Sequence, residues 1–373
     1  MKWVFWGAAA VIAYTYLGYV GWLWVRGQLR PRPVQRASYV PRVSIVMVVR
    51  NEEKVLGRKL QNLADVNYPA ERVEIIVVSD GSTDSTDEIL SQHAEGPRFR
   101  VIVSRQPRGK AYGLNDAIGA AQGEIVIFTD ARQEIEPDAV RLLLENFADP
   151  TVGCASGELM LGDPGSGEAA KGMGLYWRIE KKIRELEAAS GSVIGATGAL
   201  YAVRRALLAP LLPDTILDDV YLPMNVARQG GRVIFDSRAR AWDSPNLGDR
   251  WEFARKVRTL SGNYQLVQLA PWLLGGGNPL RFEFVSHKLM RLVVPFALAT
   301  VLVSSVSIHE LFYQVAMWTQ IGFYGLSVLA PRDLKLGPVG RIADAACTFV
   351  VLNAAALVAF TNFVTGRKAV WIR

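Results

Sequence analysis

The fold is decided by Val43-Ser-Ile-Val-Met-Val-Val49 and by the polar run Arg50-Asn51-Glu52-Glu53 that follows it directly. The first run is apolar and rich in β-branched residues, which is typical of a strand buried on both faces. Downstream, apolar residues recur at helical spacing: Val55, Leu56, Leu60 and Leu63. A strand that passes through a polar turn into a helix is the repeating unit of a parallel sheet covered by helices.

The same alternation continues along the chain. Further strands are predicted at residues 73–78, 100–103 and 124–128, and helices at residues 110–121 and 138–147. We therefore expect an α/β domain over residues 43–270, with a Rossmann-like, mostly parallel sheet that binds its ligands beyond the carboxyl ends of the strands. Residues 271–288, which are rich in Gly and Pro at their start, are predicted to form a hinge or interfacial segment.

Composition narrows the class of protein. Half of the 373 residues are hydrophobic and only 21% are charged, so part of the apolar material lies in long uncharged runs. Two cysteines and three histidines exclude a disulfide scaffold and a His-rich zinc site. The net charge of +7 comes largely from basic residues beside the apolar runs, so we expect contact with a membrane and none with nucleic acid.

The N-terminal apolar run is long enough to cross a bilayer. Residues 3–25 carry no charge, and tryptophans lie at both ends, where a membrane meets water. We expect a transmembrane helix over residues 1–26, followed by a basic linker over residues 27–42. That linker has four arginines and no acidic residue, which places it and the α/β domain in the cytoplasm by the positive-inside rule.

Three more uncharged runs close the chain, at residues 292–308, 311–331 and 345–366. They predict two or three transmembrane helices within residues 289–366, before a basic tail at residues 367–373. Three crossings would put this basic tail outside, against the positive-inside rule. Either the tail lies outside, or one segment is re-entrant or interfacial. In both cases we expect a multi-pass protein of the inner or plasma membrane with a cytoplasmic catalytic domain.

Polar residues stand where three predicted strands end. They belong to Val49-Arg50-Asn51-Glu52, Ser79-Asp80-Gly81 and Phe128-Thr129-Asp130-Ala131-Arg132. A single Asp-Gly after a strand is often only a turn. Three such sites at one rim of a sheet favour a ligand site instead.

Five motifs in order strengthen this interpretation: VVRNEE, VSDGSTDST, GKAYGLNDA, FTDA and TILDDVYLP. Together they resemble a family 2 glycosyltransferase of the GT-A type over residues 43–265, and the flanking apolar helices resemble those of the hyaluronan, chitin and cellulose synthase group. The resemblance implies a GT-A domain with transmembrane helices on both sides. It also implies inverting transfer of a sugar from a nucleotide-sugar donor, with a UDP-sugar as the favoured case.

The resemblance assigns a donor site to the first three motifs. Asp80 would accept a hydrogen bond from N3–H of uracil, a donor that suits an acceptor-only carboxylate. The backbone of Val49 and Asn51 would pack against the base, and Glu52 would lie near the ribose. Lys110 would meet the diphosphate, although a solvated residue at a helix start is the alternative.

Asp130 matches the first Asp of the family's Asp-x-Asp metal motif, which implies Mg²⁺ or Mn²⁺. The second Asp is replaced by Arg132. Either Asp130 holds the metal with water and with Gln133 or Glu134, or Arg132 itself contacts the diphosphate and weakens the need for metal. We favour the metal, because Asp130 otherwise lacks a chemical role.

Leu217-Asp218-Asp219-Val220 resembles the family's Glu-Asp motif, whose second residue is the general base. Asp219 would take the proton of the acceptor hydroxyl, and the charge of Asp218 would raise its pKa. Acidic residues also favour a helix N-terminus, and both interpretations can hold together.

Two further motifs complete the predicted site. Arg258 matches the Arg of a Gln-x-x-Arg-Trp motif and would neutralise the leaving diphosphate, with Arg255 in place of the Gln and Thr259 in place of the Trp. The alternative for this segment is a basic amphipathic helix on anionic lipid. Thr197 and Gly198 resemble a loop that lines the acceptor site.

The predicted function is transfer of a sugar to a hydroxyl of a growing polysaccharide or of a lipid-linked acceptor. Loss of the aromatic residue at Thr259 disfavours processive polymerisation, so a non-processive transferase that glycosylates a lipid carrier is the alternative. A catalytically degenerate membrane scaffold is the alternative from a different class of protein.

Overall fold

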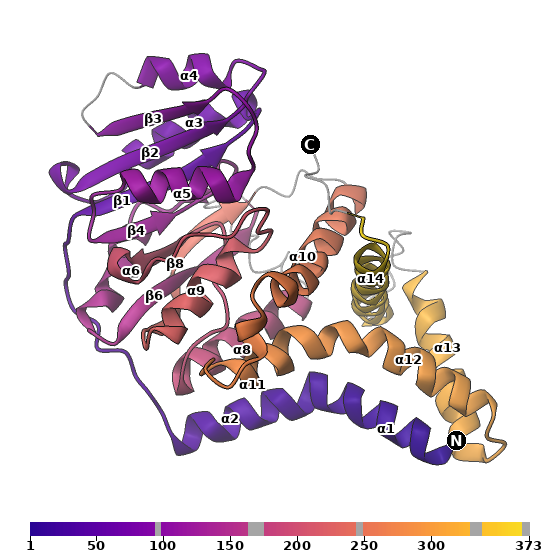
Figure 1. Cartoon of the computed structure of the whole chain (residues 1–373). Coiled ribbons are helices and arrows are strands. Elements are labelled where there is room, and N and C mark those ends of the chain that lie inside the picture. Colours follow the sequence, from indigo (N-terminus) through magenta and orange to yellow (C-terminus); the bar gives the residue numbers. More distant parts are fainter. Residues whose placement is uncertain (94–97, 163–174, 244–248, 329–337, 368–373) are drawn as a thin grey trace.

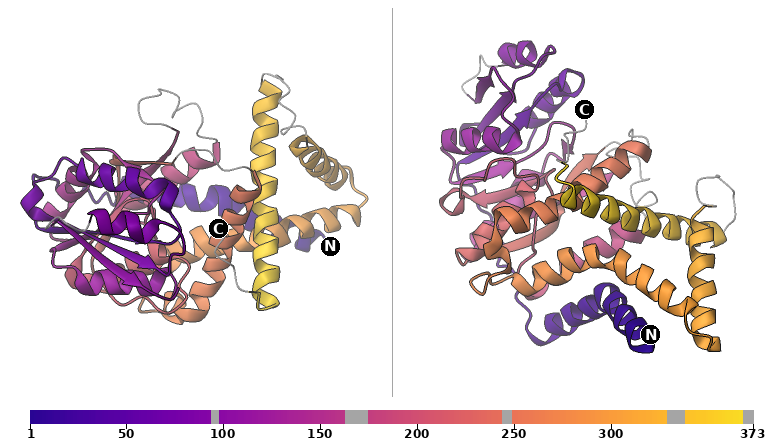
Figure 2. Two further views of the ribbon diagram at one scale, coloured as in Figure 1. Left: turned by 90° about the horizontal axis from the view of Figure 1, so that it is seen from above. Right: turned by 45° about the vertical axis from the view of Figure 1, so that its right-hand side comes forward.

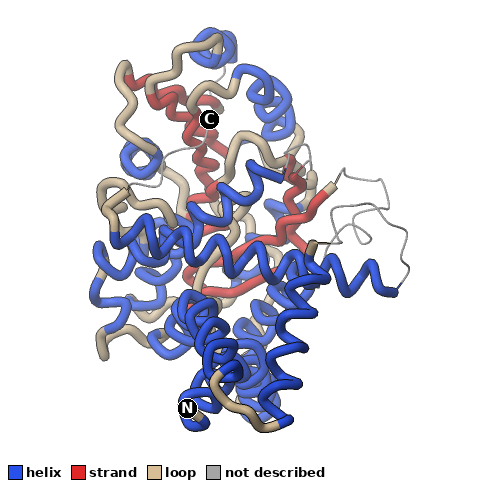
Figure 3. Tube along the Cα trace, turned by 90° about the vertical axis from the view of Figure 1, so that its right-hand side faces the viewer, coloured by secondary structure: helices blue, strands red, loops and turns tan. Residues whose placement is uncertain are grey.

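A computed structural model describes residues 1–93, 98–162, 175–243, 249–328 and 338–367. Figure 1 shows a sheet domain and, to one side of it, a layer of long helices formed by the two ends of the chain. In Figure 3 this helical layer faces the viewer and the strands lie behind it.

The domain is built on one eight-stranded sheet in the order β3-β2-β1-β4-β7-β6-β8-β5. Its strands are β1 (Val43–Val49), β2 (Val73–Asp80), β3 (Phe99–Ser104), β4 (Ile125–Phe128), β5 (Glu134–Ile135), β6 (Val152–Leu161), β7 (Tyr201–Arg204) and β8 (Arg232–Asp243). The strands β3, β2, β1 and β4 are parallel, as are β6 and β8, whereas β7 and β5 pair antiparallel with their neighbours. The predicted mostly parallel sheet is thus confirmed.

Helices cover both faces of this sheet. They are α3 (Glu53–Ala64), α4 (Thr86–His93), α5 (Lys110–Ala120), α6 (Ala139–Leu144), α8 (Leu175–Ser190) and α9 (Asp218–Arg228). Helix α10 (Asp249–Leu269) extends from this domain toward the long helices at the end of the chain. Short 3₁₀ turns lie at Ala70–Arg72, Glu145–Ala148, Arg205–Leu207 and Pro271–Leu274.

The side-chain alternation of β1 produces two cores. Ile45 and Met47 point to the face that α3 and α6 cover, and Val46 points to the face covered by α5 and α9. All three side chains are fully buried. Because both faces of the strand are packed, its sequence is a continuous apolar run instead of an alternating one.

Four long helices lie outside the sheet domain in the part of the chain that the structure describes. Lys2–Leu29 is one helix made of α1 (Lys2–Ala13), a π-helical turn (Tyr14–Gly18) and α2 (Tyr19–Leu29). Arg281–Val306 is built in the same way from α11 (Arg281–Phe284), a π-helical turn (Val285–Leu289) and α12 (Met290–Val306). The last two are α13 (Leu311–Ser327) and α14 (Pro338–Val364).

Three of these helices are long and apolar enough to cross a membrane, within the ranges that the structure describes: Lys2–Leu29, Arg281–Val306 and Ile342–Val364. The helical run therefore begins at Arg281, inside the segment expected as a hinge, and the N-terminal helix extends three residues past the expected boundary at residue 26. The basic tail lies mostly outside the described residues.

The first and last parts of the chain pack together. Helix α1 lies beside α12, and the N-terminal helix bends where α1 meets α2 (Figure 2). The two π-helical turns face each other, since the hydroxyl groups of Tyr14 and Ser286 are 2.7 Å apart. Arg26 forms an ion pair with Glu283, and α10 of the sheet domain packs on α14.

Candidate active site

Three distant stretches of the chain meet at Lys110, the first residue of α5. Its Nζ lies 3.0 Å from Oδ1 of Asp130, which follows β4, and 3.2 Å from Oδ1 of Asp218, which opens α9. Burial opposes the positive charge, but Asp130 and Asp218 outweigh it and raise the pKa of Lys110. The ammonium group therefore stays charged and links the predicted metal motif to the predicted catalytic motif.

Gly198 marks the space that the carboxylates share. A Cβ atom at this residue would lie 3.4 Å from Oδ2 of Asp130 and 3.9 Å from Oδ2 of Asp219. The two carboxylates thus face one space from opposite elements, and the absent side chain of Gly198 keeps that space open. The prediction that the acidic motifs come together holds for Asp130, Asp218 and Asp219.

Asp218 and Asp219 have different surroundings although they are neighbours. Asp218 is buried, accepts a hydrogen bond from the Tyr201 hydroxyl at 3.3 Å and is paired with Lys110. Asp219 is partly exposed, and its backbone carbonyl accepts a hydrogen bond from the Ala196 N–H at 2.7 Å. Asp218 is therefore anchored, whereas the carboxylate of Asp219 remains accessible beside Gly198.

The pKa of Asp219 is raised to about 6. Desolvation by the surrounding protein is the largest cause and the charge of Asp218 is the second, while Lys110, Lys288 and Arg184 act in the opposite direction. A carboxylate with this pKa is ionised at neutral pH and is a stronger base than an ordinary aspartate.

Asp80 organises the loop that leads into Lys110. Its two carboxylate oxygens accept hydrogen bonds from the backbone N–H groups of Arg108, at 2.7 Å, and Gly109, at 2.8 Å. Gly81 has a φ of +64°, and a Cβ there would lie 2.5 Å from the backbone nitrogen of Pro107. The Asp-Gly pair therefore fixes the start of α5, and any bond from a nucleobase would use the remaining lone pairs of Asp80.

Glu52 and Arg132, which were predicted for the donor site, form an ion pair. The Nε of Arg132 lies 3.3 Å and 3.4 Å from the two carboxylate oxygens of Glu52. Beside them, Asn51 has a φ of 54° and accepts a hydrogen bond from the Thr83 N–H at 2.8 Å. This contact joins the ends of β1 and β2, while Val49 lies buried at the end of its strand.

The metal-binding capacity of the protein alone is small. Among the residues that the structure describes, no group of three or more His, Cys, Asp or Glu side chains is arranged to hold a metal ion. Asp130 has one oxygen on Lys110 and the other facing the space at Gly198. One carboxylate fits a divalent cation that takes most of its ligands from phosphate oxygens and water.

Two residues predicted for the site, Arg255 and Arg258, lie on α10. Arg255 forms an ion pair with Asp243 at 3.4 Å, and the Thr259 hydroxyl donates to the Arg255 carbonyl within the helix. Arg258 is half-buried on the same helix. Thr197 directly precedes Gly198, and its N–H donates to the hydroxyl of the buried Ser156 at 3.0 Å.

Lys59 is a residue of the site region that our reasoning from the sequence missed. It lies on α3 with only 2% of its surface exposed, and burial lowers its pKa to about 7. Its Nζ donates to Oγ1 of Thr129 at 3.0 Å and to the carbonyl of Gln133 at 2.6 Å. The signal was present, because a lysine four residues after Val55 and three after Leu56 falls on the apolar face of that helix.

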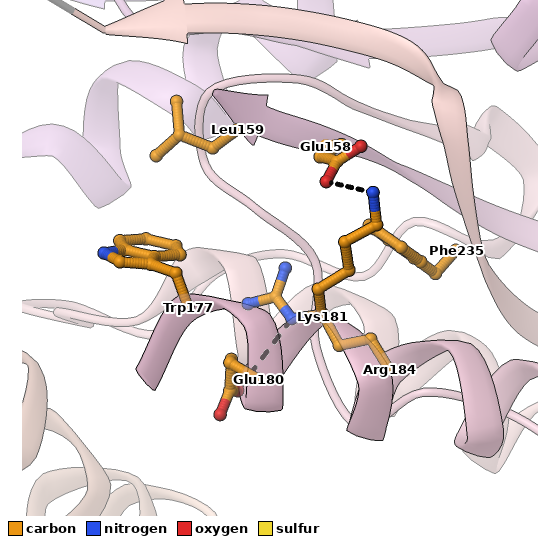
Figure 4. A pocket seen from close by; sticks show the side chains of 7 residues that line it. All are labelled: Glu158, Leu159, Trp177, Glu180, Lys181, Arg184 and Phe235. Atoms are coloured by element: carbon orange, nitrogen blue, oxygen red, sulfur yellow. Dashed lines mark ion pairs between the residues drawn. The ribbon is translucent and has the colours of Figure 1, made fainter. Parts of the chain in front are cut away.

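A narrow pocket lies between the sheet and α8 (Figure 4). It is lined by Glu158, Leu159, Trp177, Glu180, Lys181, Arg184 and Phe235. Both basic side chains are paired with acidic ones: Lys181 with Glu158 at 2.7 Å, and Arg184 with Glu180 at 3.9 Å. Glu180 also meets Arg291 at 2.8 Å, so this region joins α8 to the helix Arg281–Val306.

Residues 44–212 match the family described as glycosyl transferase family 2. The chain therefore carries a domain of this family, and the predicted resemblance is confirmed.

Two curated relatives are similar to parts of the chain. A beta-monoglucosyldiacylglycerol synthase of Synechocystis sp. is 28% identical over 192 residues, which cover 50% of this chain and 40% of the relative. A poly-beta-1,6-N-acetyl-D-glucosamine synthase of Staphylococcus aureus is 24% identical over 249 residues, which cover 65% of this chain and 60% of the relative. The matched region thus spans about half the length of these relatives.

A solved structure extends the similarity to the whole fold. The mannosyltransferase of Pyrobaculum calidifontis, in complex with GDP-Man and Mn²⁺, superposes with a TM-score of 0.75 at 22% identity. The similarity covers 98% of this chain and 100% of that one. It confirms the predicted fold class, a GT-A-like domain with apolar helices on both sides.

Proposed function

We propose that this protein is an inverting glycosyltransferase that moves a sugar from a nucleotide-sugar donor to a hydroxyl group at the membrane. The observation that carries the proposal is the pair of carboxylate oxygens, from Asp130 and Asp219, that face one space across Gly198. One belongs to the motif expected at the donor diphosphate and the other to the motif expected at the acceptor. The family 2 domain found over residues 44–212 supports the same reaction class.

The donor would lie along the ends of β1, β2 and β4. The nucleobase would meet Asp80 and the backbone of Val49 and Asn51, with the ribose near Glu52. The buried, charged Lys110 supplies a cation for the diphosphate beside Asp130. A UDP-sugar is the favoured donor, because a carboxylate at Asp80 suits the N3–H of uracil.

The reaction would proceed by a single displacement. The acceptor oxygen forms a bond to the anomeric carbon, the bond from that carbon to the diphosphate oxygen breaks, and the acceptor proton passes to the carboxylate of Asp219. Because attack and departure occur on opposite sides, the anomeric configuration inverts. The raised pKa of Asp219 suits this proton transfer. Asp218 and Lys110 form an ion pair, so their charges offset each other beside the base.

Negative charge grows on the leaving diphosphate during this step. Asp130 would hold a divalent cation, Mg²⁺ or Mn²⁺, that neutralises this charge when it is bound. Arg258 and Arg255 would approach the same group from α10. Arg132 is held by Glu52 at the edge of the donor site, where its charge adds to the attraction for phosphate.

The acceptor is proposed to be a neutral hydroxyl. A lipid phosphate would carry its own nucleophilic oxygen and would be repelled by the three carboxylates of Asp130, Asp218 and Asp219. A hydroxyl group instead needs the base that Asp219 supplies. The apolar helices bring the site to a membrane surface, which suits a glycan or a lipid-linked acceptor.

Single transfer to a lipid carrier is the second candidate. Thr259 stands where an aromatic side chain would support a growing chain, and its hydroxyl is turned back onto its own helix. A processive synthase would lack that support here. Sizing the labelled product separates the two, since a polymer indicates a synthase and a single-sugar lipid indicates the second candidate.

The testing experiment uses the full-length protein in membranes with a panel of labelled UDP- and GDP-sugars. We expect transfer from one donor, strongest for a UDP-sugar, and its loss in Asp219→Asn while nucleotide binding persists. Full activity in Asp219→Asn would contradict the proposal. Nucleotide binding without turnover in the unmodified protein would favour the degenerate scaffold.

A further inference from the structure

The buried side chain of Lys59 holds the loop that carries Asp130. Its Nζ donates to Oγ1 of Thr129 and to the carbonyl of Gln133, the two residues that flank the Asp130–Arg132 turn. A lysine that is only 2% exposed is rare, because removing an ammonium group from water is costly unless its N–H groups find acceptors. Here two acceptors lie on one short loop.

The hydroxyl of Thr129 links Lys59 to the segment that contains Gly198 and Ala199. It accepts from Lys59 and donates its own proton to the carbonyl of Ala199 at 2.9 Å. Ala199 follows Gly198, where a Cβ atom would lie 3.4 Å from Oδ2 of Asp130 and 3.9 Å from Oδ2 of Asp219. A hydroxyl that accepts a hydrogen bond becomes a stronger donor, so the two hydrogen bonds reinforce each other.

We infer that Lys59 is a positioning residue that sets the separation between Asp130 and the Gly198 space through the relay Lys59–Thr129–Ala199. The inference rests on the proposed function, since it assigns to this relay the alignment of the donor side with the acceptor side. Lys59 itself lies beneath the rim and touches no reacting atom. Its effect is therefore expected in the turnover number and not in recognition of the nucleotide.

The variants are chosen to cut the relay at different points. Lys59→Met keeps the length of the side chain but cannot donate, and Thr129→Val keeps the shape but has no hydroxyl. Thr129→Ser restores the hydroxyl alone. Lys54→Met is the matched control, because Lys54 lies exposed on the same helix.

We expect Lys59→Met and Thr129→Val each to lower kcat by about 10- to 100-fold, the scale of a small misplacement of reacting groups. The Kd for UDP in the presence of a chelator should stay within about twofold of the unmodified protein, because the nucleotide contacts at Asp80 are untouched. Thr129→Ser should retain most of the activity. The double variant should be no slower than the slower single one, since a relay is broken only once.

Hydrogen exchange supplies a readout that needs no turnover. In Lys59→Met, exchange should rise at residues 129–133 and 197–200 together, and remain unchanged at α4. If this happens while the unmodified protein transfers no sugar, the relay stands and the proposed function fails. If the unmodified protein is active and Lys59→Met alters neither kcat nor exchange, the inference about Lys59 is wrong. Losses that multiply in the double variant, or a Thr129→Ser variant as slow as Thr129→Val, would also overturn it.

Discussion

The Nζ of Lys110 lies 3.2 Å from Oδ1 of Asp218, the immediate neighbour of the proposed base. The same ammonium group contacts Asp130, in the motif predicted for the donor diphosphate. Two carboxylates from separate motifs are thus held by one cation, and the third carboxylate, Asp219, faces the space at Gly198. Lys110 also acts to lower the pKa of Asp219, against desolvation and the charge of Asp218, which raise it.

Lys110→Met should lower kcat by about 100-fold or more, because a preorganised cation beside the diphosphate is lost. Since Lys110 lowers the pKa of Asp219, its removal should also shift the acidic limb of the pH profile upward. Steady-state kinetics over a range of pH measure both effects. An unshifted limb would show that Lys110 does not act on the base.

The unmodified enzyme should show kcat/KM rising with pH through about 6, as Asp219 loses its proton.

The raised pKa of Asp219 also has a consequence for the stability of the fold. Because the folded-state pKa lies above the ordinary value near 4, folding favours the protonated form. The contribution of Asp219 to the free energy of unfolding is therefore complete below its pKa in the unfolded state. This contribution is lost as pH rises through about 6, its pKa in the folded state. Thermal unfolding of Asp219→Asn against pH, compared with the unmodified protein, checks the sign.

Gly198→Ala should block transfer without harming the fold. The added methyl group would make ordinary contacts at 3.4 Å and 3.9 Å with the two carboxylates, so no strain is expected. It would, however, occupy the space between donor and base, and we expect kcat to fall at least about tenfold. Gly57→Ala is the control: its Cβ meets nothing within 4 Å on an exposed turn of α3, so it should raise stability by about 0.5–1 kcal/mol and leave kcat unchanged.

Chelation of divalent cations should abolish transfer, and Mn²⁺ or Mg²⁺ should restore it. Because Asp130 offers a single free oxygen, cation binding should depend on the nucleotide and be weak in its absence. Calorimetric titration of Mn²⁺ with and without UDP measures this dependence. Activity that survives complete chelation would instead support direct contact of Arg132 with the diphosphate.

Glu180→Gln should destabilise the junction between α8 and the helix Arg281–Val306. Glu180 is buried and accepts from both Arg291 and His287, so its neutralisation removes the negative charge that both groups contact. Losing one partner of a buried pair costs about 3–5 kcal/mol. Glu185→Gln is the control, since Glu185 belongs to an exposed pair with Lys182 and should cost under about 1 kcal/mol. Thermal unfolding in detergent compares the two.

Local sequence patterns were enough to predict the strands of the first half of the sheet. The strands β1 to β4 are short runs that are mostly apolar and are followed by polar residues, and Asp130, which follows β4, contacts Lys110. The strands β6 and β8 were not predicted, because β6 contains Gly157 and Glu158, and β8 contains five charged residues. The two strands pair with each other, β6 also pairs with β7 and β8 with β5, and such contacts leave no periodic signal in the sequence.

The candidate site could likewise be predicted from the sequence only in part. Motif positions predicted Asp130, Asp218 and Asp219, but they did not reveal that Arg132 would be held by Glu52 or that Lys59 would be buried below them. These contacts join residues about 70 to 80 positions apart, so only the folded chain brings them together. The role of Arg258 stays a prediction from the motif.

The ion pair between Arg26 and Glu283 joins residues 257 positions apart. A ribosome adding roughly 5–20 residues per second would need about 13 to 51 s to supply the second partner after the first. During that interval Arg26 has no Glu283 to pair with, and the face of α1 that packs on α12 has no partner helix. The contact between the N-terminal helix and the helix Arg281–Val306 therefore forms only after most of the chain has been synthesised.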